Sequence, residues 1–561
     1  MTESALRVLM AMLLAGVALS GTSLPSFAQQ ATVEKAALTK VVIAPPRSDL
    51  ARIIKAGLQK AYYEADKDTR AYAQAQKLYF FYGARGFEPL WLTPGVGSAI
   101  SFSDNAEKIL DVFKAAELEG FRPSDYLTAD LDPAAAGSDP TKLAALETAF
   151  SQAAVRYAQD AYGGRITPTA VSANFVIAPK RIDEAATLLE LAAADDPGQV
   201  LLGIGPKNPE FMRLKTVLAK FYDGSVQVEQ ITIPDGKTLK LGMDDERVPV
   251  LRQRLGVAAP EIPEGATDAQ VDITYDQALA DAITAFQSEM GLTADGVMGP
   301  ATVAALNGGG NVGKDDIIAN MERWRWEPED FGDFNVQVNI PEFTLWIKRD
   351  GETVHTTRVV VGTPKNQTPI FSDMIRHIVV NPYWNVPPSI AAGEIKPHLI
   401  ANPNYLATQN MEMLSGGKVI NAAAIDWTVT NINNYSVRQK PGPGNALGKV
   451  KFLFPNSHNI YLHDTPSKSL FSRAFRAYSH GCVRVMNPLE FAGALVATNP
   501  ALSQASLEGL FGDKEKWVNM NNHVPVHLMY FTLRVDENGT VRSYGDVYGH
   551  NKKLIELLNA E

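Results

Sequence analysis

The spacing of apolar positions changes along the chain and divides it into helix-forming and strand-forming regions. Between residues 48 and 230, apolar residues recur at three- and four-residue intervals, which predicts amphipathic helices. The segments 50–86, 103–121 and 143–164 carry this pattern, and the first and last of them end at glycines, as helices commonly do. We therefore expect a helical scaffold domain over 48–230, without a catalytic constellation of its own.

A second, shorter helical pattern follows in residues 240–307. The segment 243–257 predicts one short helix, and Pro300 suits the first turn of another helix that ends at Asn307. Between them, a single helical stripe carries four apolar residues: Leu279, Ile283, Phe286 and Met290. These signals predict a small three-helix domain, followed by a linker and a short helix over 308–330.

From residue 331 onward the apolar period shortens to two, which indicates strands. Polar residues alternate there with four apolar ones, a pattern that predicts a half-buried strand: Phe334, Val336, Val338 and Ile340. Five further segments continue the β series: 344–348, 356–362, 375–382, 459–463 and 525–535. One helix is expected in 487–499, with Asn487 as its N-cap and Pro488 at its first position. Residues 331–550 should form a β-rich domain, and the whole chain a multidomain α+β fold.

A long segment interrupts the β series between residues 386 and 450. It contains Pro387 and Pro388, mixed helix-like stretches and the sequence RQKPGPGNALG. A segment of this length inside a compact β domain is usually functional. We expect it to cap a site, whereas Trp324 and Trp326, just upstream of the β-rich domain, are expected to be packing residues.

The first 28 residues are typical of a secretion signal. Arg7 precedes an apolar run from Val8 to Leu19, which is too short to cross a membrane as a helix, and Ser26 to Ala28 suit a cleavage site. The alternative is an uncleaved membrane anchor. The rest of the chain has no apolar run of spanning length, so we expect a mature protein without a membrane span, exported to the periplasm.

Charge argues against a nucleic-acid-binding function. The chain carries a net charge of −10, yet residues 331–561 hold 21 lysines and arginines against 18 aspartates and glutamates. Neither part shows the basic stripe that nucleic-acid binding requires. All nine histidines lie from His355 onward, so side-chain chemistry near neutral pH belongs to the β-rich domain.

The only cysteine, Cys482, lies in the string Ser479-His480-Gly481-Cys482, and His463 precedes it at a predicted strand end. A single cysteine in an exported chain cannot form an internal disulfide. It is therefore either a small buried apolar residue or a reactive thiol, and composition does not decide between them. A zinc site is a third use of these residues, with Asp464 as the nearest further ligand.

A cysteine nucleophile needs a base or cation beside it, a dry site and backbone N–H groups for the oxyanion. Gly481 removes a side chain where a substrate carbonyl must approach, and the amides of His480, Gly481 and Cys482 are candidates for an oxyanion hole. Arg484 is placed to hold a carboxylate or to brace the loop.

Longer motifs carry a family resemblance. The strings MERWRW, GTPKNQTPIFSD, NPYWNVPPSI and IYLHDTP, together with SHGCVRV, resemble the L,D-transpeptidase family with a YkuD-type catalytic domain, in its large Gram-negative type. The pattern of FQ, GL, DG, GP and TVAAL within 240–307 is similar to a peptidoglycan-binding-like domain. This second resemblance implies attachment to the cell wall, and the alternative is a module that only packs against its neighbours.

The resemblance implies roles for individual residues. Cys482 would be the nucleophile and His463 the general acid and base, oriented by the backbone carbonyl of Asp464, with the Asp464 carboxylate as the alternative. Ser479, His480 and Gly481 would shape the loop and the oxyanion hole. Tyr461 and Trp384 are candidates for lining the cleft, although each is as well explained by packing. The segment 386–450 occupies the place of the family's substrate-capping insertion.

The implied reaction is cell-wall cross-linking without a metal or organic cofactor. The thiolate would take the acyl group of a peptidoglycan tetrapeptide stem, release D-Ala and pass the acyl group to an amine, which gives a 3–3 cross-link. The amine of an envelope lipoprotein or outer-membrane protein would give a protein–wall bond instead. Carbapenems should acylate such an enzyme. The alternatives are an L,D-carboxypeptidase on the same fold and a non-catalytic wall-binding protein.

Overall fold

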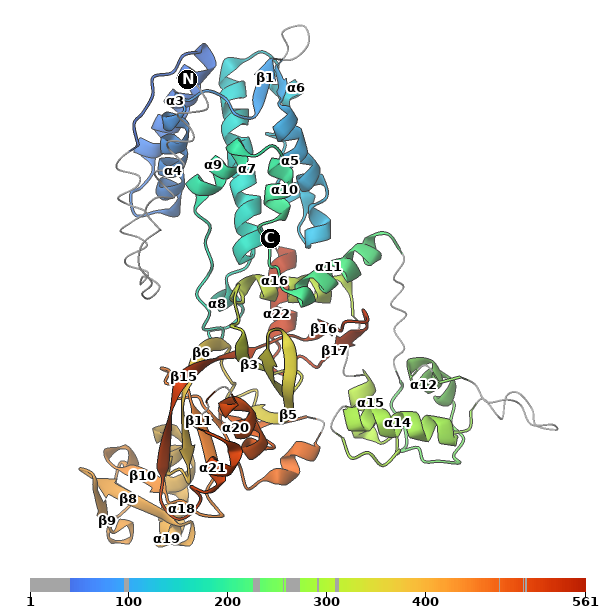
Figure 1. Cartoon of the computed structure of the whole chain (residues 1–561), viewed down its shortest axis with the longest axis vertical. Coiled ribbons are helices and arrows are strands. Elements are labelled where there is room, and N and C mark those ends of the chain that lie inside the picture. Colours follow the sequence, from blue (N-terminus) through green and yellow to red (C-terminus); the bar gives the residue numbers. More distant parts are fainter. Residues whose placement is uncertain are drawn as a thin grey trace, which may run out of the picture. The chain divides into compact units, whose positions relative to one another are not determined.

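The computed structural model describes most of the chain after its first forty residues: residues 41–94, 100–224, 233–255, 257–258, 273–289, 292–307, 312–473, 475–497, 499 and 502–560. The expected secretion signal and Met290 lie outside these described residues. Two compact units form (Figure 1), of which the first comprises Met1–Lys114, Ser124–Ala158 and Asp183–Gly203. The second comprises Ala115–Pro123, Gln159–Ile182 and Ile204–Glu561.

The first unit is built mainly of helices around an aromatic core. Its principal helices are α3 (Asp49–Glu64), α4 (Arg70–Ala84), α5 (Asp104–Lys114), α9 (Glu184–Ala193), α10 (Pro197–Leu202) and most of α7 (Pro140–Gly163). Ser48 and Thr69 cap α3 and α4 by accepting hydrogen bonds from backbone N–H groups of the first turn. Phe113, Phe150 and Tyr126 pack together, with ring centroids 5.6 to 6.1 Å apart. The predicted helices are confirmed here.

In the described residues of the predicted small domain there are three short helices. They are α12 (Val248–Leu255), α14 (Gln277–Glu289) and α15 (Pro300–Asn307). Leu279 and Ile283 are fully buried in the core of this domain, and Phe286 packs against it, as the stripe predicts. The Gln287 side chain is also buried, where it accepts a hydrogen bond from the Gly296 N–H and donates one to the Val297 carbonyl. These bonds tie the turn before α15 to α14.

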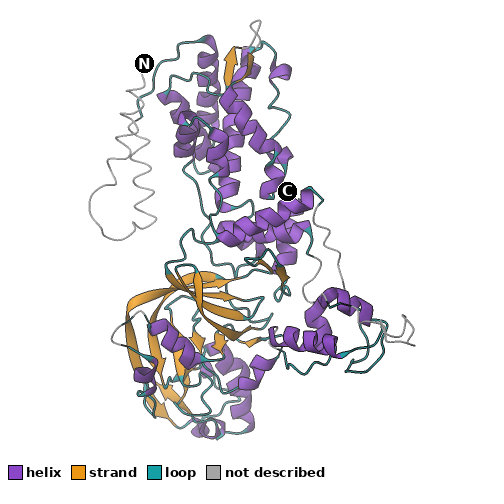
Figure 2. Ribbon diagram, turned by 45° about the vertical axis from the view of Figure 1, so that its right-hand side comes forward, coloured by secondary structure: helices purple, strands orange, loops and turns teal. Residues whose placement is uncertain are grey.

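A nine-stranded sheet dominates the second unit (Figure 2). Its order is β13-β5-β14-β12-β11-β6-β15-β3-β4, and an additional pairing of β5 with β4 closes it on itself. The strands are β3 (Phe334–Asn339), β4 (Thr344–Arg349), β5 (Glu352–Gly362), β6 (Phe371–Val380), β11 (Val450–Leu453), β12 (Leu462–His463), β13 (Ala477–Ser479), β14 (Val483–Val485) and β15 (Lys516–Met529). Because β4 pairs with β5, the last strand of the sheet is not left as an exposed edge.

The prediction of a half-buried first strand is wrong, because β3 is buried on both faces. Its polar residues Asn335, Gln337 and Asn339 are buried together with the apolar ones. Asn339 compensates through its side-chain amide, which donates to the Phe531 carbonyl (2.9 Å) and accepts from the Phe531 N–H (2.8 Å). Alternation therefore located the strand correctly but did not show that its polar face is also covered.

Helices pack around the closed sheet. They include α8 (Pro168–Val171), α11 (Pro209–Tyr222), α16 (Lys314–Trp326), α20 (Pro488–Val496) and α22 (His550–Ala560). Trp324 stacks on Phe531 with centroids 4.4 Å apart, and Trp326 meets Phe175 edge-on, so both tryptophans are packing residues as expected. Asn487 is the N-cap residue of α20, but its side chain bonds Glu490 rather than a backbone N–H.

The interrupting segment is a folded subdomain with its own core. Strands β7 (Trp384–Asn385), β10 (Ser436–Gln439), β8 (Met411–Ser415) and β9 (Lys418–Ile420) form a separate four-stranded sheet. Helices α17 (Pro388–Ile390), α18 (Lys396–Ala401) and α19 (Tyr405–Thr408) and a π-helical turn, Ala391–Ile395, complete it. Val386, Leu399, Met413 and Trp427 are buried within it. We call residues 386–450 with Trp384 the lid subdomain.

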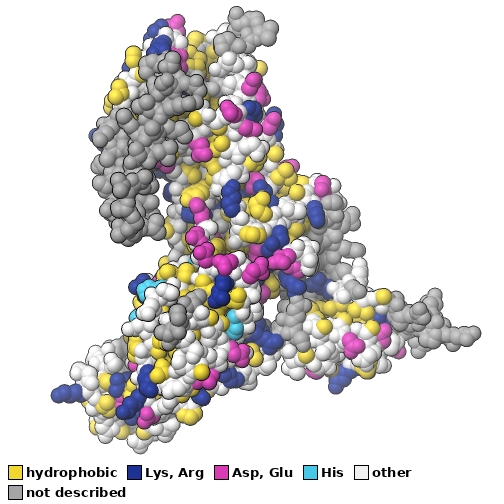
Figure 3. All heavy atoms as spheres, in the orientation of Figure 1, with side chains coloured by type: hydrophobic (Ala, Val, Ile, Leu, Met, Phe, Trp, Pro, Cys, Tyr) yellow, Lys and Arg dark blue, Asp and Glu magenta, His cyan; other side chains and the backbone are white. Residues whose placement is uncertain are grey.

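On the face drawn in Figure 3, lysine and arginine side chains are interspersed with acidic ones rather than gathered into a stripe. None of the helices in the described part of the chain is both long enough and apolar enough to cross a membrane.

Candidate active site

Three ionisable side chains form a row across neighbouring strands of the closed sheet. Lys451 on β11 pairs with His463 on β12, and His463 pairs with Arg484 on β14. Residues directly opposite one another on adjacent strands project from the same face. The row therefore places an imidazole between two cations.

The thiol lies on the same face of the sheet. Cys482 stands two residues before Arg484, and Tyr461 stands two residues before His463, so both share the face of the row. The Val483 N–H donates to the Tyr461 carbonyl (3.1 Å) and fixes the two segments side by side. The Tyr461 ring meets the His463 ring edge-on at 5.6 Å. Sheet register thus brings together residues that are 19 positions apart, Cys482 and His463.

One hydrogen bond fixes the tautomer of His463. Its Nδ1 lies 2.5 Å from the backbone carbonyl oxygen of Asp464, and a carbonyl can only accept, so Nδ1 carries the hydrogen. Nε2 therefore presents a lone pair. Burial lowers the pKa of His463 to about 3, and the Arg484 cation acts in the same direction. The imidazole is neutral at pH 7 and able to accept a proton.

The carboxylate of Asp464 has other partners. Its Oδ2 accepts from the Lys449 N–H (2.8 Å), and its Oδ1 accepts from the Thr465 N–H and from the Lys468 ammonium, each at 2.7 Å. Of the two alternatives left open by the sequence, the backbone carbonyl is the one bonded to the imidazole.

Cys482 is half-buried and rests as a neutral thiol. Burial raises the pKa of the thiol to about 11, while hydrogen bonds from the Tyr461 backbone and hydroxyl, followed by the Arg484 and Lys451 charges, lower it. The Sγ atom lies 3.7 Å from the Asn459 carbonyl oxygen, which accepts from the S–H. At rest the site therefore holds a neutral thiol and a neutral imidazole on the same face of the sheet.

The loop before the thiol is braced from within. The Ser479 hydroxyl donates to the Cys482 carbonyl and accepts from the Gly481 N–H (3.1 Å). Gly481 has φ +110°, and a methyl group there would lie 3.2 Å from Ile460. The Gly481 amide is thus already bonded inside the loop. Of the three amides predicted to form an oxyanion hole, those of His480 and Cys482 remain as candidates.

A second set of bonds supports the loop from outside. The Thr368 hydroxyl donates to the Gly481 carbonyl (2.7 Å) and accepts from the Gly362 N–H (2.9 Å). The Tyr548 hydroxyl accepts from the Thr368 N–H and donates to the Gly362 carbonyl. Asn174 donates to the Gln367 side chain at 2.7 Å. Segments far apart in the chain therefore converge beneath the thiol loop.

His480 faces the lid subdomain rather than His463. Its Nε2 lies 2.9 Å from Oε1 of Glu394, and both side chains are about half exposed. Glu394 belongs to the π-helical turn of the lid. This contact joins the lid directly to the loop that carries the thiol.

Of the two predicted cleft residues, Tyr461 contacts the chemical groups, and Trp384 packs against the core of the lid subdomain. Within the described residues, Trp384 makes no contact with Cys482. Arg484 is half-buried, and its Nε has no hydrogen-bond partner in that same part of the chain. Its charge reaches Cys482 and His463, as the causes of their pKa shifts show.

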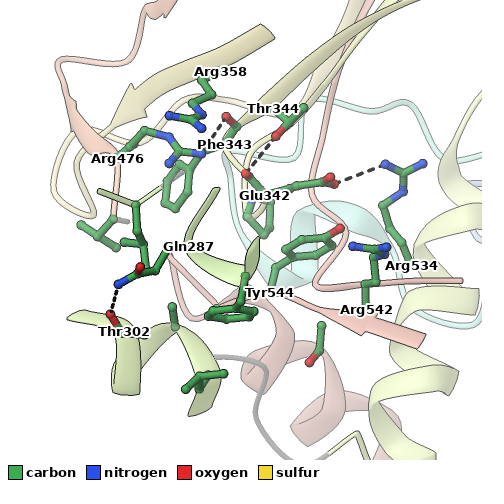
Figure 4. Close-up of a pocket in the computed structure, with 18 of the residues that line it drawn as sticks. Gln287, Thr302, Glu342, Phe343, Thr344, Arg358, Arg476, Arg534, Arg542 and Tyr544 are labelled. Carbon is green, nitrogen blue, oxygen red and sulfur yellow. Dashed lines mark hydrogen bonds and ion pairs between the residues drawn. The ribbon is translucent and has the colours of Figure 1, made fainter. Parts of the chain in front are cut away.

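A separate polar pocket lies elsewhere in the second unit. Part of its wall is the Glu342 carboxylate, which lies 3.3 Å from Arg534 and accepts from Asn339 (Figure 4). Arg534 also stacks over the Trp346 ring at 4.4 Å. Neither Cys482 nor His463 lines this pocket. In the described residues, moreover, no cluster of histidine, cysteine, aspartate or glutamate has the geometry of a metal site.

A thiol, a neutral imidazole and flanking cations lie on one face of the closed sheet, and these are groups that acyl transfer through a cysteine requires. Comparison with known proteins gives three domain matches. Residues 333–501 match the L,D-transpeptidase catalytic domain (YkuD), residues 76–218 match a scaffold domain, and residues 253–306 match a "Putative peptidoglycan binding domain". The match to the L,D-transpeptidase catalytic domain covers much of the β-rich part of the chain, and the order of the three matches agrees with the resemblance seen in the sequence.

One curated relative and several solved structures are similar. A chain from Haemophilus influenzae named "Putative L,D-transpeptidase" is 37% identical over 240 residues, which span 42% of this chain and 48% of that relative. An L,D-transpeptidase structure from Xylanimonas cellulosilytica is 17% identical and covers 53% of this chain and 99% of its own, with a TM-score of 0.17. Another from Stackebrandtia nassauensis is 16% identical, covers 53% and 95%, and has a TM-score of 0.21. Scores this low carry no argument about this chain.

Sequence reasoning missed four contributors to the site: Lys451, Thr368, Tyr548 and Glu394. Lys451 had a local signal, since it is the single charge inside the apolar run VKFLF. Such a lysine in a buried strand must face a polar site. The other three had no local signal, because their roles depend on contacts between distant segments.

Proposed function

We propose that this protein is a peptidoglycan L,D-transpeptidase that forms 3–3 cross-links through a thioester on Cys482. The observation that carries the proposal is the bond from His463 Nδ1 to the Asp464 carbonyl. It leaves Nε2 as a base on the sheet face that bears the only thiol. The match of residues 333–501 to the L,D-transpeptidase catalytic domain supports the choice of reaction.

In the proposed first half-reaction, His463 Nε2 takes the thiol proton as Sγ attacks the carbonyl of the third stem residue. The carbon–nitrogen bond to the terminal D-Ala then breaks. His463 gives the proton to the departing amine, so that D-Ala leaves and a thioester remains. Because both groups rest neutral, proton transfer accompanies attack, and no stable thiolate–imidazolium pair is formed beforehand.

In the second half-reaction, an amine from another stem attacks the thioester. His463 removes a proton from that amine and returns it to the thiol as the carbon–sulfur bond breaks. The amide of the 3–3 cross-link is the product. If water attacks instead, the product is the trimmed stem of an L,D-carboxypeptidase. The lid subdomain, joined to the thiol loop through Glu394, would favour the amine by excluding water.

The proposed substrate is peptidoglycan, and the proposed setting is the periplasm. The match of residues 253–306 to a peptidoglycan-binding domain supports the cell wall as substrate. We place the protein in the periplasm, after removal of residues 1–28. A stem peptide is the proposed acceptor, and an envelope lipoprotein or outer-membrane protein is a further acceptor of the same amine chemistry. Neither half-reaction needs a metal or an organic cofactor.

The test compares Cys482→Ala with the wild type. Incubation with a tetrapeptide stem or a carbapenem should add the acyl mass to the wild-type protein and none to the variant, as read by intact mass. Products from purified sacculi should contain 3–3 linked dimers with the wild type. His523→Gln, which changes an exposed histidine, serves as the control and should behave as the wild type.

Acylation of Cys482→Ala would overturn the nucleophile. Acylation of the wild type followed only by water-derived products would overturn transpeptidation in favour of the carboxypeptidase. Absence of acylation in the wild type with both probes would overturn the enzymatic function altogether.

A further inference from the structure

Lys451 is a buried cation without an ionic partner. It is 8% exposed, and its ammonium makes no hydrogen bond or ion pair with any described residue. Lysine is almost never buried to this degree unless it is paired. Removing an ammonium from water costs free energy that only an anion or several acceptors can return. An anion bound next to the Lys451 ammonium would therefore offset the cost of burying it.

The described groups around Lys451 do not include an anion paired with its ammonium. Its Nζ lies 5.4 Å from the centre of the Tyr461 ring and 6.0 Å from that of Trp517. Glu515 is the nearby carboxylate, but it is not within ion-pair distance. Its oxygens instead accept hydrogen bonds from the Tyr383 N–H (2.8 Å) and the Trp517 indole N–H (3.1 Å). Two aromatic rings flank the ammonium and leave it available to a ligand.

The order of strands gives the position of that ligand. Cys482 precedes β14, His463 lies on β12 and Lys451 on β11, and these strands are consecutive in the sheet. His463 and Lys451 are direct partners, one strand spacing of about 4.8 Å apart, whereas Cys482 lies one strand and two residues away from His463 on the same face. In acyl transfer from a stem peptide, the scissile carbonyl lies at the thiol and the departing nitrogen at the imidazole. The terminal carboxylate is two bonds beyond that nitrogen, on the side of Lys451.

Resting on the proposed function, we infer that Lys451 binds the terminal carboxylate of the departing D-amino acid. This makes the enzyme selective for a donor stem that ends one residue after the scissile bond. A longer stem carries an uncharged amide at that place, and it would leave the ammonium buried and unpaired. Burial also lowers the pKa of Lys451, a cost that a bound carboxylate would offset. Arg484, on the thiol's own strand, is not needed for this contact.

The first experiment tests the cation without a stem peptide. Iodoacetate and iodoacetamide alkylate a thiol at nearly the same size, but only iodoacetate carries a carboxylate. The measured quantity is the rate of Cys482 alkylation by iodoacetate divided by the rate with iodoacetamide. In Lys451→Gln this ratio should fall about 10-fold, which corresponds to the loss of one hydrogen bond to a charged group. Lys451→Arg should retain most of the ratio. Lys449→Gln, which removes an exposed charge two residues away, is the matched control and should leave it unchanged.

The second experiment assigns the carboxylate. The wild type should be acylated more efficiently by a tetrapeptide stem with a free terminal carboxylate than by the same stem with a terminal amide. Lys451→Gln should lose that preference by raising KM for the acid about 10-fold, with KM for the amide unchanged. Thermal unfolding of each variant shows that the fold is retained.

An unchanged alkylation ratio in Lys451→Gln, or an equal fall in Lys449→Gln, would overturn an anion site at Lys451. A fall in the ratio without loss of the acid preference would overturn the assignment to the departing carboxylate. If no stem acylates the wild type, the proposed function fails, and the alkylation ratio still decides the anion site.

Discussion

At His463, a single hydrogen bond decides which ring nitrogen can act as a base. Because the Asp464 carbonyl holds the hydrogen on Nδ1, the catalytic proton must pass through Nε2. The second consequence is electrical. A buried imidazole between two cations is held neutral, so it cannot stabilise a thiolate as a resting ion pair. This site differs in that respect from cysteine enzymes with a thiolate–imidazolium pair.

The alkylation rate of the wild type should therefore have a simple pH profile. The thiol pKa is raised to about 11, so the thiolate is lost as pH falls below that value. We expect the rate with iodoacetamide to climb tenfold per pH unit from 6 to 10, measured by intact mass at Cys482. A step or plateau between pH 5 and 8 would contradict a neutral resting pair.

At this scale the sequence was informative because the chemistry is concentrated in two short motifs. SHGC and the strand-end HD identify the thiol and the imidazole without any knowledge of pairing. The choice between the carbonyl and the carboxylate of Asp464 could not be made, since it depends on Lys449 and Lys468 occupying the carboxylate. Placing Lys451 next to His463 required the register of β11 with β12, which the sequence does not contain.

The lid subdomain is a folded body that is joined to the thiol loop by a contact of one carboxylate. Its buried Trp427 and its own sheet make it a folded body, and its described contact with the thiol loop passes through one carboxylate, Glu394. Deletion of residues 438–448 would be a crude test of whether the lid subdomain favours cross-links over hydrolysis. That range includes Gln439 and Asn445, whose buried side chains hold the lid turn, so deletion would unfold more than a cap.

A single substitution is the sharper test of the lid. Glu394→Gln removes the charge that contacts His480 and keeps the size of the side chain. We expect the share of hydrolysed stems among the products to rise about 2- to 5-fold, as loss of a half-exposed charged contact allows. Product analysis by mass spectrometry measures it. Glu537→Gln, an exposed carboxylate in a turn, is the control, and an unchanged product ratio in Glu394→Gln would contradict the role of the contact.

Elements were predictable wherever one face alone is covered. The helices of the scaffold and small domains fit their stripes because their polar faces meet water. Strand β3 did not fit, because Phe531 approaches its polar side and pairs with Asn339. Local alternation carries no information about a segment that arrives from nearly two hundred residues away. For the same reason the lid was recognised as an insertion but not as a sheet with its own core.

Over the whole molecule, buried neutral histidines make stability depend on pH. Burial lowers the pKa of His463 to about 3, and that of His527 and of His550 to about 4, against 6.5 for an ordinary histidine. Between these values the unfolded chain binds protons that the native chain does not. The free energy of unfolding contributed by these groups is therefore fully present above pH 6.5 and is lost as pH falls toward 4.

The comparison of wild type with His527→Gln isolates this effect. His527 bridges the Ser372 hydroxyl and the Phe331 carbonyl, and glutamine can keep part of that bridge without a titratable ring. We expect the difference in unfolding free energy between the two proteins to shrink by roughly 2 kcal/mol from pH 7 to pH 4.5, measured by denaturant unfolding. A difference that stays constant with pH would contradict the assignment. The subtraction also cancels Glu327, whose pKa burial raises to about 8 and which therefore acts in the opposite direction.

The contacts that close the sheet and support the thiol loop join segments far apart in the chain, and this affects when they can form. Asn339 on the first strand meets Phe531 across 192 positions, and Thr368, beneath the thiol loop, meets Tyr548 across 180. Contacts over such separations form late, because the intervening chain must first be made and ordered. During synthesis, Cys482 therefore emerges well before the strand and the tyrosine that complete its surroundings. The thiol loop can therefore reach the arrangement described above only after Phe531 and Tyr548 have been synthesised and have packed.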